Sequence, residues 1–161
     1  MTGTFTKRSD KLAFYGVGGV EPVFHKMQGF TSIVTSKNPQ TYTRRYVDEP
    51  FEQSDVVGYS PSVAYTFDRF AGNAVHDDIV MISDRELTGD EAVRSIVIVD
   101  LATPTGEGFT AVKREFSIIP DSEGNDTDAY TYTGTMKVKG EMVYGTAVIN
   151  GDVCTFTETA V

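Results

Sequence analysis

Tryptophan is absent from the 161-residue chain, cysteine occurs once and histidine only twice. A single thiol cannot form a disulfide within the chain, so nothing in the sequence points to an oxidising compartment. The polar N-terminal stretch "MTGTFTKRSDK" lacks the apolar core of a signal peptide. No apolar run approaches the roughly 18–20 residues that a membrane span needs. We therefore expect a protein made in the cytoplasm, without a membrane anchor.

Basic residues are also scarce. Acidic residues outnumber them by 23 to 14, and the formal net charge is −9. A protein of this sign repels phosphates, which disfavours classical nucleic-acid binding, and the same charge keeps it soluble. Hydrophobic residues make up 40% of the chain, which is ordinary for a globular protein. The length predicts one domain over residues 1–161, with a core of its own.

Apolar residues recur mainly with a period of two, the pattern of β-strands. Residues 62–70 alternate most clearly, with Val63, Tyr65 and Phe67 on one side. Residues 96–99 form an unbroken apolar run, which predicts a strand covered on both faces. Further strands are expected at 11–15, 22–27, 29–36, 92–101, 108–119 and 130–138, and an acidic loop at 120–128.

One segment departs from this period. Val75, Ile79 and Ile82 have the spacing of one helical stripe, and Asn73 is a suitable N-cap. The pattern predicts one α-helix over about 73–85, which packs on the 96–99 strand and places His76 on its polar side. The predicted fold is therefore mainly β, an antiparallel β-sandwich or barrel with one flanking α-helix.

Asn150-Gly151 lies between two strand patterns, which is a strong hairpin signal. If these two residues formed the turn, Val148 would pair with Val153, and Ala147 with Cys154. Cys154 is then interpreted as a small core residue rather than a nucleophile.

Signatures of catalysis are scarce. The stretch "GVGGV" (16–20) is followed by a strand pattern rather than by the helix that a phosphate loop needs. The stretch "DSEGNDTD" (121–128) resembles a calcium loop, but Tyr132 occupies the position of the closing acid. For His76 beside Asp77 and Asp78, a solvated helix face is favoured over a metal site. We expect no enzyme, and no catalytic, metal or cofactor-binding residues.

Residues 35–61 form a long polar excursion without a core pattern. Structureless loops beyond about 12–15 residues are uncommon in compact domains and are usually functional. Here aromatic residues and arginines are mixed with acids, which is typical of protein–protein contacts. An ordinary long hairpin lying on its own sheet is the alternative. The residues predicted to contact another subunit are Lys37, Tyr42, Arg44, Arg45, Tyr46, Asp48, Glu49, Phe51, Glu52 and Asp55.

The stretches "KRSDKLAFYGV", "GFTSIVTSKNP" and "YTRRYVDEPFEQSDVVGYSPSVAYTFDRF", with the following residues up to "SIVIVDL", carry a resemblance. They resemble major tail tube proteins of long-tailed, non-contractile bacteriophages. The resemblance covers roughly residues 5–120 well and the C-terminal hairpins more loosely. It implies a small β-sandwich or barrel with a flanking helix and a long hairpin that contacts an adjoining subunit or ring.

The resemblance also implies function and partners. Six copies would form a ring, and stacked rings would form a hollow tube in the tail of a virion, assembled in the cytoplasm of a bacterial host. The implied partners are further copies of the chain, the tape-measure protein, and the tail terminator and distal tail proteins. Double-stranded DNA would pass through the lumen without being bound, and a lumen lined by carboxylates would repel it.

Two other functions stay open at this stage. The first is the inner tube of a contractile tail or of an injection machine, which shares the fold that the resemblance implies. The second is a monomeric β-sandwich binding module, for example for carbohydrate. The absence of tryptophan and of a convergent polar and aromatic pocket pattern disfavours the second.

Overall fold

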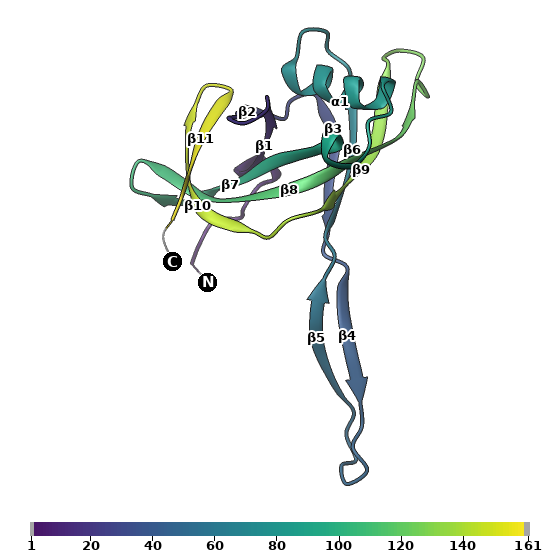
Figure 1. The fold of residues 1–161 in the computed structure, drawn as a ribbon. Helices are drawn as coiled ribbons and strands as arrows, with labels where there is room; N and C mark the ends of the chain where they lie inside the picture. The colour runs from purple at the N-terminus through teal and green to yellow at the C-terminus, as the bar shows by residue number, and fades with distance from the viewer. Residues whose placement is uncertain (1, 160–161) are drawn as a thin grey trace.

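The computed structural model describes residues 2–159, and they form an antiparallel β-structure with one α-helix (Figure 1). The helix α1 spans Ala74–Asp84, and two short 3-10 helices span Arg8–Asp10 and Gly89–Ala92. The strands are β1 Lys11–Val17, β2 Val23–Lys26, β3 Phe30–Ser36, β4 Pro39–Arg44, β5 Gln53–Tyr59, β6 Ser62–Asp68, β7 Val93–Thr105, β8 Gly108–Glu123, β9 Thr131–Val138, β10 Val143–Asn150 and β11 Val153–Glu158.

Six strands close into a barrel because one edge of β8 pairs with β7, while its other edge pairs with two different strands along its length. The sheet runs in the order β10-β11-β2-β1-β7-β8, and β10 also pairs with β8. The first part of β8, from Phe109 to Lys113, pairs with β10, and the second part, from Phe116 to Glu123, pairs with β9. From β9 the sheet continues through β6 to β3, which pairs on one side only. The predicted sandwich or barrel is therefore a six-stranded barrel extended by three strands.

Two hydrophobic cores lie on opposite faces of the shared strands. One fills the barrel and includes Phe14, Val97 and Val99. The other lies between the extended sheet and α1 and includes Tyr15 and Ile96. Neighbouring residues of β1 and β7 point to opposite faces, so both cores depend on the same two strands. The prediction that the 96–99 run is covered on both faces is confirmed for Ile96, Val97 and Val99, whereas Ile98 is only partly buried.

The helix begins where the sequence predicts. The side chain of Asn73 accepts hydrogen bonds from the backbone N–H groups of Val75 and His76, which satisfies two free donors of the first turn. Further along α1, Asp78 accepts a hydrogen bond from the hydroxyl of Tyr15 and one from Nε of Arg94. This buried network fixes α1 to β1 and β7.

The prediction that His76 lies on the polar side of the helix is wrong. Its ring is fully buried and stacks on Phe67, with ring centroids 4.5 Å apart. Nδ1 accepts a hydrogen bond from the backbone N–H of Phe70 at 3.0 Å, so Nε2 donates to the carbonyl of Gln28, at 2.6 Å. His76 thus joins the loop before β3, the loop after β6 and the helix, a role that helical periodicity alone does not reveal.

Two further expectations need correction. The C-terminal hairpin pairs Asn150 with Val153 and Ile149 with Cys154, so its turn is Gly151-Asp152 and not Asn150-Gly151. Gly151 has φ +67°, and glycine is favoured at the first central position of such a turn. Residues 120–123, expected in an acidic loop, instead continue β8 and pair with β9 across a bulge between Pro120 and Ser122. Cys154 is buried, as predicted.

Replacement of Val97 by Asp should unfold the subunit. Val97 is fully buried inside the barrel, and an unpaired carboxyl group there costs several kcal/mol, comparable with the roughly 5–15 kcal/mol that stabilises a typical domain. Circular dichroism should show no cooperative melting transition. Val148→Asp is the control, because Val148 is exposed on β10 and the change should cost less than about 1 kcal/mol. A Val97→Asp variant that melts like the unmodified chain would show that the barrel is not filled as described.

His76 should make the fold sensitive to acid. Burial lowers the pKa of His76 below its usual value, against a smaller opposing effect of its hydrogen bond to Gln28. Since the unfolded chain then takes up the proton first, the contribution of His76 to the free energy of unfolding should be constant above about pH 7 and fall below about pH 6.5. His76→Leu should cost about 2 kcal/mol or more at pH 8, because the partners at Phe70 and Gln28 lose their hydrogen bonds.

The same variant should also lose the additional decline between pH 7 and pH 5, which urea titrations at a series of pH values would measure. His25→Gln serves as the control and should keep that decline. An unchanged pH profile in His76→Leu would rule out His76 as its source.

Candidate assembly surface

Strands β4 and β5 form a separate two-stranded sheet that projects from the body as a long arm (Figure 1). The root of the arm, where it leaves the body, is at Asn38. Its φ of 47° turns the chain between β3 and β4. The Asn38 side chain donates hydrogen bonds to the Ser60 carbonyl and the Ser62 hydroxyl, and the Ser60 N–H donates to the Lys37 carbonyl. The β3–β6 pair therefore continues into the arm, and the excursion predicted at 35–61 is a projecting hairpin.

All ten residues predicted to contact another subunit lie on this arm, but they fall into separate groups. Lys37 lies at the root. Tyr42 and Arg44 lie on β4, and Asp55 lies on β5 opposite Tyr42. The others lie in or beside the loop at the tip, which spans residues 45–52: Arg45, Tyr46, Asp48, Glu49, Phe51 and Glu52.

Arg44 is the centre of a cluster that stabilises the arm itself. Its guanidinium forms an ion pair with Asp55 at 2.6 Å and donates a hydrogen bond to the Tyr46 hydroxyl at 2.7 Å. It also lies 5.1 Å from the centre of the Tyr42 ring, within the range of a cation–π interaction. Because these partners occupy it, the Arg44 side chain is only 24% exposed. An isolated two-stranded hairpin is marginally stable in water, so this cluster supplies contacts that a core would otherwise supply.

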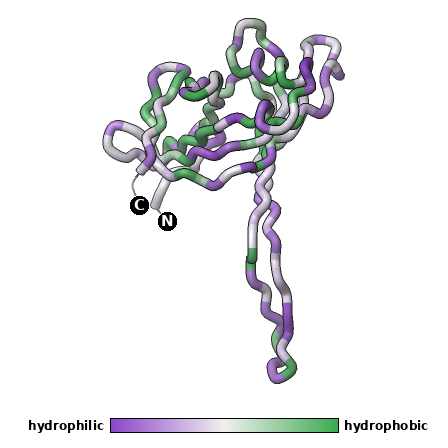
Figure 2. The backbone as a smooth tube through the Cα atoms, viewed as in Figure 1, coloured by the Kyte–Doolittle hydropathy of each residue, from purple (hydrophilic) through white to green (hydrophobic). Residues whose placement is uncertain are grey.

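The tip carries exposed apolar side chains and acidic side chains that form no ion pair within residues 2–159. Val47 is fully exposed and Phe51 is 75% exposed. Among residues 2–159, no ion pair involves Asp48, Glu49 or Glu52, although Glu49 accepts a hydrogen bond from Gln53. Figure 2 shows apolar positions at the tip of an otherwise largely polar arm. Val47 was missing from the predicted contact set, because a single valine in a polar stretch gives no periodic signal.

The arm exposes more apolar surface than an isolated subunit needs. Besides the tip, large side chains on β4 and β5 are about half exposed or more: Tyr42, Val56, Val57 and Tyr59. Several large apolar side chains left exposed on one projecting element are typical of a site of protein–protein contact. The arm is therefore the candidate functional surface of the chain.

The part of the chain that the structure describes gives little evidence for a metal site, a reactive thiol or a membrane-spanning helix. Within it, no group of three or more His, Cys, Asp and Glu side chains is placed to hold a metal ion. Burial raises the pKa of Cys154 to about 12, so its thiol stays protonated and is a poor nucleophile. No helix between residues 2 and 159 has the length and apolar character to cross a membrane.

Comparisons with known proteins identify similar structures but no similar sequence. No family model and no curated protein matches the chain. One similar structure is described as the tail of an empty GTA particle with C6 symmetry, and it has a TM-score of 0.64, 13% identity and coverage of 86% of this chain and 97% of the other. A second belongs to the virion of a native gene transfer agent (GTA) particle, with a TM-score of 0.56, 14% identity and coverage of 86% and 97%.

A third similar structure belongs to the six-fold symmetrised baseplate of the anti-feeding prophage. It has a TM-score of 0.52 and 12% identity, and the match covers 89% of this chain and 97% of the other. At 12–14% identity these likenesses establish a shared fold. The predicted fold class, a mainly β structure of the tail tube type, is confirmed. None of the three particles is described as a long-tailed, non-contractile bacteriophage, so that finer assignment is not supported.

Arg44 and its neighbour Arg45 should differ in their effect on the arm. Arg44→Ala removes the ion pair and both ring contacts, so backbone amides of β4 and β5 should exchange with solvent at least about tenfold faster. Arg45→Ala is the matched control, because Arg45 is exposed and forms no ion pair within residues 2–159. Hydrogen exchange with mass spectrometry measures both. Equal exchange in the two variants would contradict the stabilising role of Arg44.

Proposed function

We propose that the chain is the structural subunit of a phage-type tail tube. The observation that carries this proposal is the projecting arm, whose exposed aromatic and aliphatic side chains find no cover within the subunit. Burial of such surface contributes about 25 cal/mol for each Å² removed from water. A second subunit would supply that cover. The likeness of fold to proteins of tail particles supports a structural role rather than catalysis.

Ring formation is supported by two different surfaces on one subunit. The arm is one, and the free edge of β3 is the other, because β3 pairs with β6 and with no other strand of the described chain. An uncovered edge favours pairing with another chain. When two different patches of identical subunits meet head to tail, the assembly closes into a ring if the rotation permits. Two similar structures come from particles described with six-fold symmetry, which supports rings of six.

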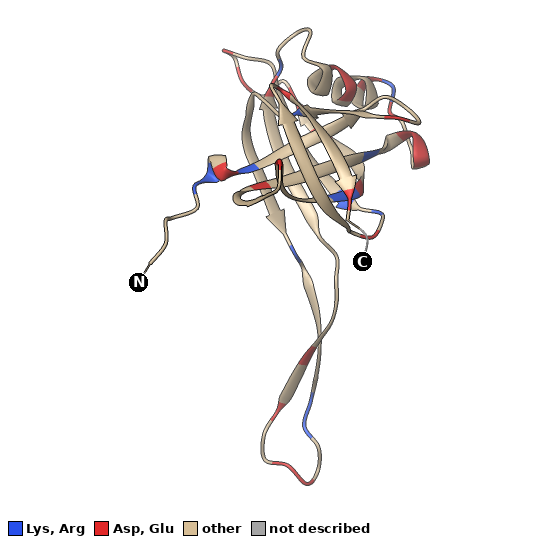
Figure 3. Ribbon diagram, turned by 90° about the vertical axis from the view of Figure 1, so that its left-hand side faces the viewer, with Lys and Arg blue, Asp and Glu red and all other residues tan. Residues whose placement is uncertain are grey.

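Stacked rings would form a hollow conduit for double-stranded DNA in the tail of a particle assembled in a bacterial cytoplasm. The net charge of −9 suits this role, because carboxylates lining a lumen repel the phosphates of DNA that must slide through. Figure 3 shows acidic residues at several places on the body as well as at the arm tip. The further partners in this proposal are a tape-measure protein, a tail terminator and distal tail proteins, which would set the length and close the ends.

Of the two kinds of tube weighed from the sequence, the comparisons support the alternative better. That alternative is the inner tube of a contractile tail or of an injection machine, and it is the one that we favour over a long-tailed, non-contractile phage. A gene for a sheath protein beside the gene for this chain would support the contractile form.

The proposal predicts that the purified chain polymerises. Concentrated protein should form hollow tubes of stacked rings in negative-stain electron micrographs, and sedimentation should show species far above the 17.6 kDa of the monomer. Removal of residues 39–59, with a short Gly-Ser linker in their place, should leave the melting temperature of the body nearly unchanged and abolish tubes. A chain that stays monomeric at every concentration would contradict the proposal and favour a monomeric binding module.

A further inference from the structure

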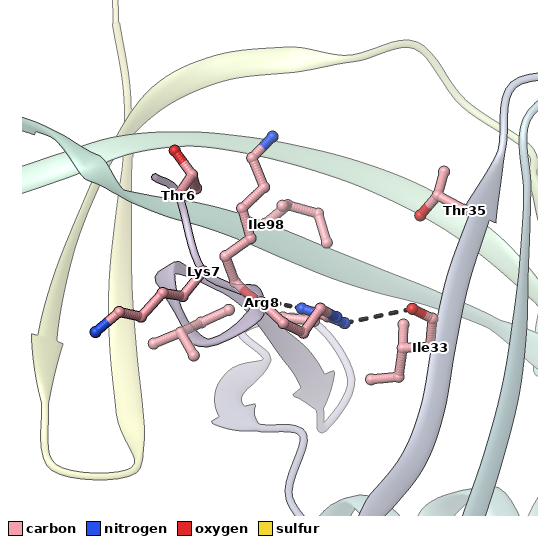
Figure 4. Close-up of a pocket in the computed structure, with 9 residues that line it drawn as sticks. Thr6, Lys7, Arg8, Ile33, Thr35 and Ile98 are labelled. Carbon is pink, nitrogen blue, oxygen red and sulfur yellow. Dashed lines mark hydrogen bonds between the residues drawn. The ribbon is translucent and has the colours of Figure 1, made fainter. Parts of the chain in front are cut away.

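A groove lies beside the root of the arm, between the N-terminal segment, β1 and the free edge of β3 (Figure 4). It consists of two adjoining hollows of about 340 and 500 Å³, which share Arg8, Lys11, Leu12, Ala13 and Ile33. Its apolar walls come from strands of three parts of the sheet, with Leu12 and Ala13 on β1, Ile33 on β3 and Ile98 on β7. We call this site the basic groove, because four basic side chains line it.

The basic groove has a charge opposite to that of the whole molecule. Four of the 14 basic residues line it, namely Lys7, Arg8, Lys11 and Lys26. None of the described residues that line it is acidic, although the chain has 23 acids. No ion pair within residues 2–159 involves any of the four bases. A concentration of unpaired positive charge in an acidic protein indicates a site for an acidic partner.

Arg8 is held in place at the centre of the basic groove. It donates hydrogen bonds to the carbonyl of Lys11 at 2.8 Å and to the carbonyl of Ile33 at 3.3 Å, as the dashed lines in Figure 4 mark. Both acceptors are neutral backbone groups, so the charge of the guanidinium stays uncompensated. Since Lys11 is on β1 and Ile33 is on β3, the two hydrogen bonds together link the start of β1 to the free edge of β3.

The tip of the arm has the complementary chemistry. It carries the unpaired acids Asp48, Glu49 and Glu52 beside the exposed apolar side chains of Val47 and Phe51. We propose that the basic groove of one subunit receives the arm tip of a second copy of the chain. The carboxylates of the tip then meet Lys7, Arg8, Lys11 and Lys26, and the apolar side chains cover the walls of the groove. This inference rests on the proposed self-assembly and names the receiving site.

The arm tip that enters the groove belongs to another copy, because each arm points away from the groove on its own subunit. In two views at right angles the arm points away from its own body (Figures 1 and 3). Val47 is ten residues beyond Lys37, and an extended chain rises about 3.3 Å per residue, so the tip lies roughly 33 Å from the root. The groove lies at the root, so each arm reaches a groove about one arm length away. Repetition of this contact links successive subunits in a regular series.

Disulfide trapping tests the docking without relying on tube formation. A Val47→Cys chain is mixed with a Thr6→Cys chain, which places thiols at the tip and at the groove, while Cys154 is buried. We expect a covalent dimer of the two chains under mild oxidation. A mixture of Val47→Cys with Asp128→Cys is the control and should give at least about tenfold less dimer. Equal yields in the two mixtures would overturn the proposal.

Charge reversal tests the complementarity directly. Asp48→Lys with Glu52→Lys at the tip, and Lys7→Glu with Lys11→Glu in the groove, should each raise the concentration needed for assembly at least about tenfold. All four substitutions in one chain should return it to within about threefold of the original. Asp126→Lys with Asp128→Lys makes the same charge change as the tip variant and should leave assembly unchanged. Failure of the combined chain to recover would overturn the proposal.

The outcomes separate the two proposals. Tubes of the unmodified chain without selective trapping at Thr6 would retain the proposed function and overturn the docking site. Selective trapping without tubes would retain the docking site and overturn the tube. If neither occurs, both proposals are wrong.

Discussion

A two-stranded sheet with solvent on both faces cannot bury its own side chains, and the proposed assembly of the chain depends on this constraint. The arm is stabilised by the contacts of Arg44 with Asp55, Tyr42 and Tyr46, and not by a core. The apolar groups at its tip, Val47 among them, remain in water in the free subunit. Such surface is costly in a monomer and useful in an assembly, where a neighbour covers it.

The body that carries the arm contains two hydrophobic cores, and the two cores share strands. The barrel core and the core under α1 lie on opposite faces of β1 and β7, and β8 joins the barrel to the strands that carry the arm. The arm continues from β3 and β6, which belong to the sheet under the helix. His76 fastens both loops that flank this pair, to Gln28 on one side and to Phe70 on the other.

Sequence periodicity predicts those parts of the fold that depend on one strand or helix. It places α1, the largely buried run at 96–99 and the excursion at 35–61 correctly. Burial imposes the period of a helix or strand on the sequence, and a helix cap depends only on residues next to the helix end. It misses features that depend on tertiary pairing. The burial of His76, the turn at Gly151-Asp152 and the strand at 120–123 are set by partners far away in the chain. The basic groove is missed for the same reason, since the apolar walls at Ile33 and Ile98 and the base Lys26 come together with the 7–11 segment only in the folded sheet.

The central claim is that the aromatic surface of the arm is solvent-exposed in the subunit and covered in the assembly. Hydroxyl-radical footprinting of Tyr42, Tyr46, Phe51 and Tyr59, in dilute and in concentrated protein, measures this directly. The account predicts rapid oxidation of these side chains in the dilute subunit and at least about fivefold protection in the assembled state, with Tyr15 protected in both. Assemblies in which the arm is oxidised as fast as in the free subunit would contradict it.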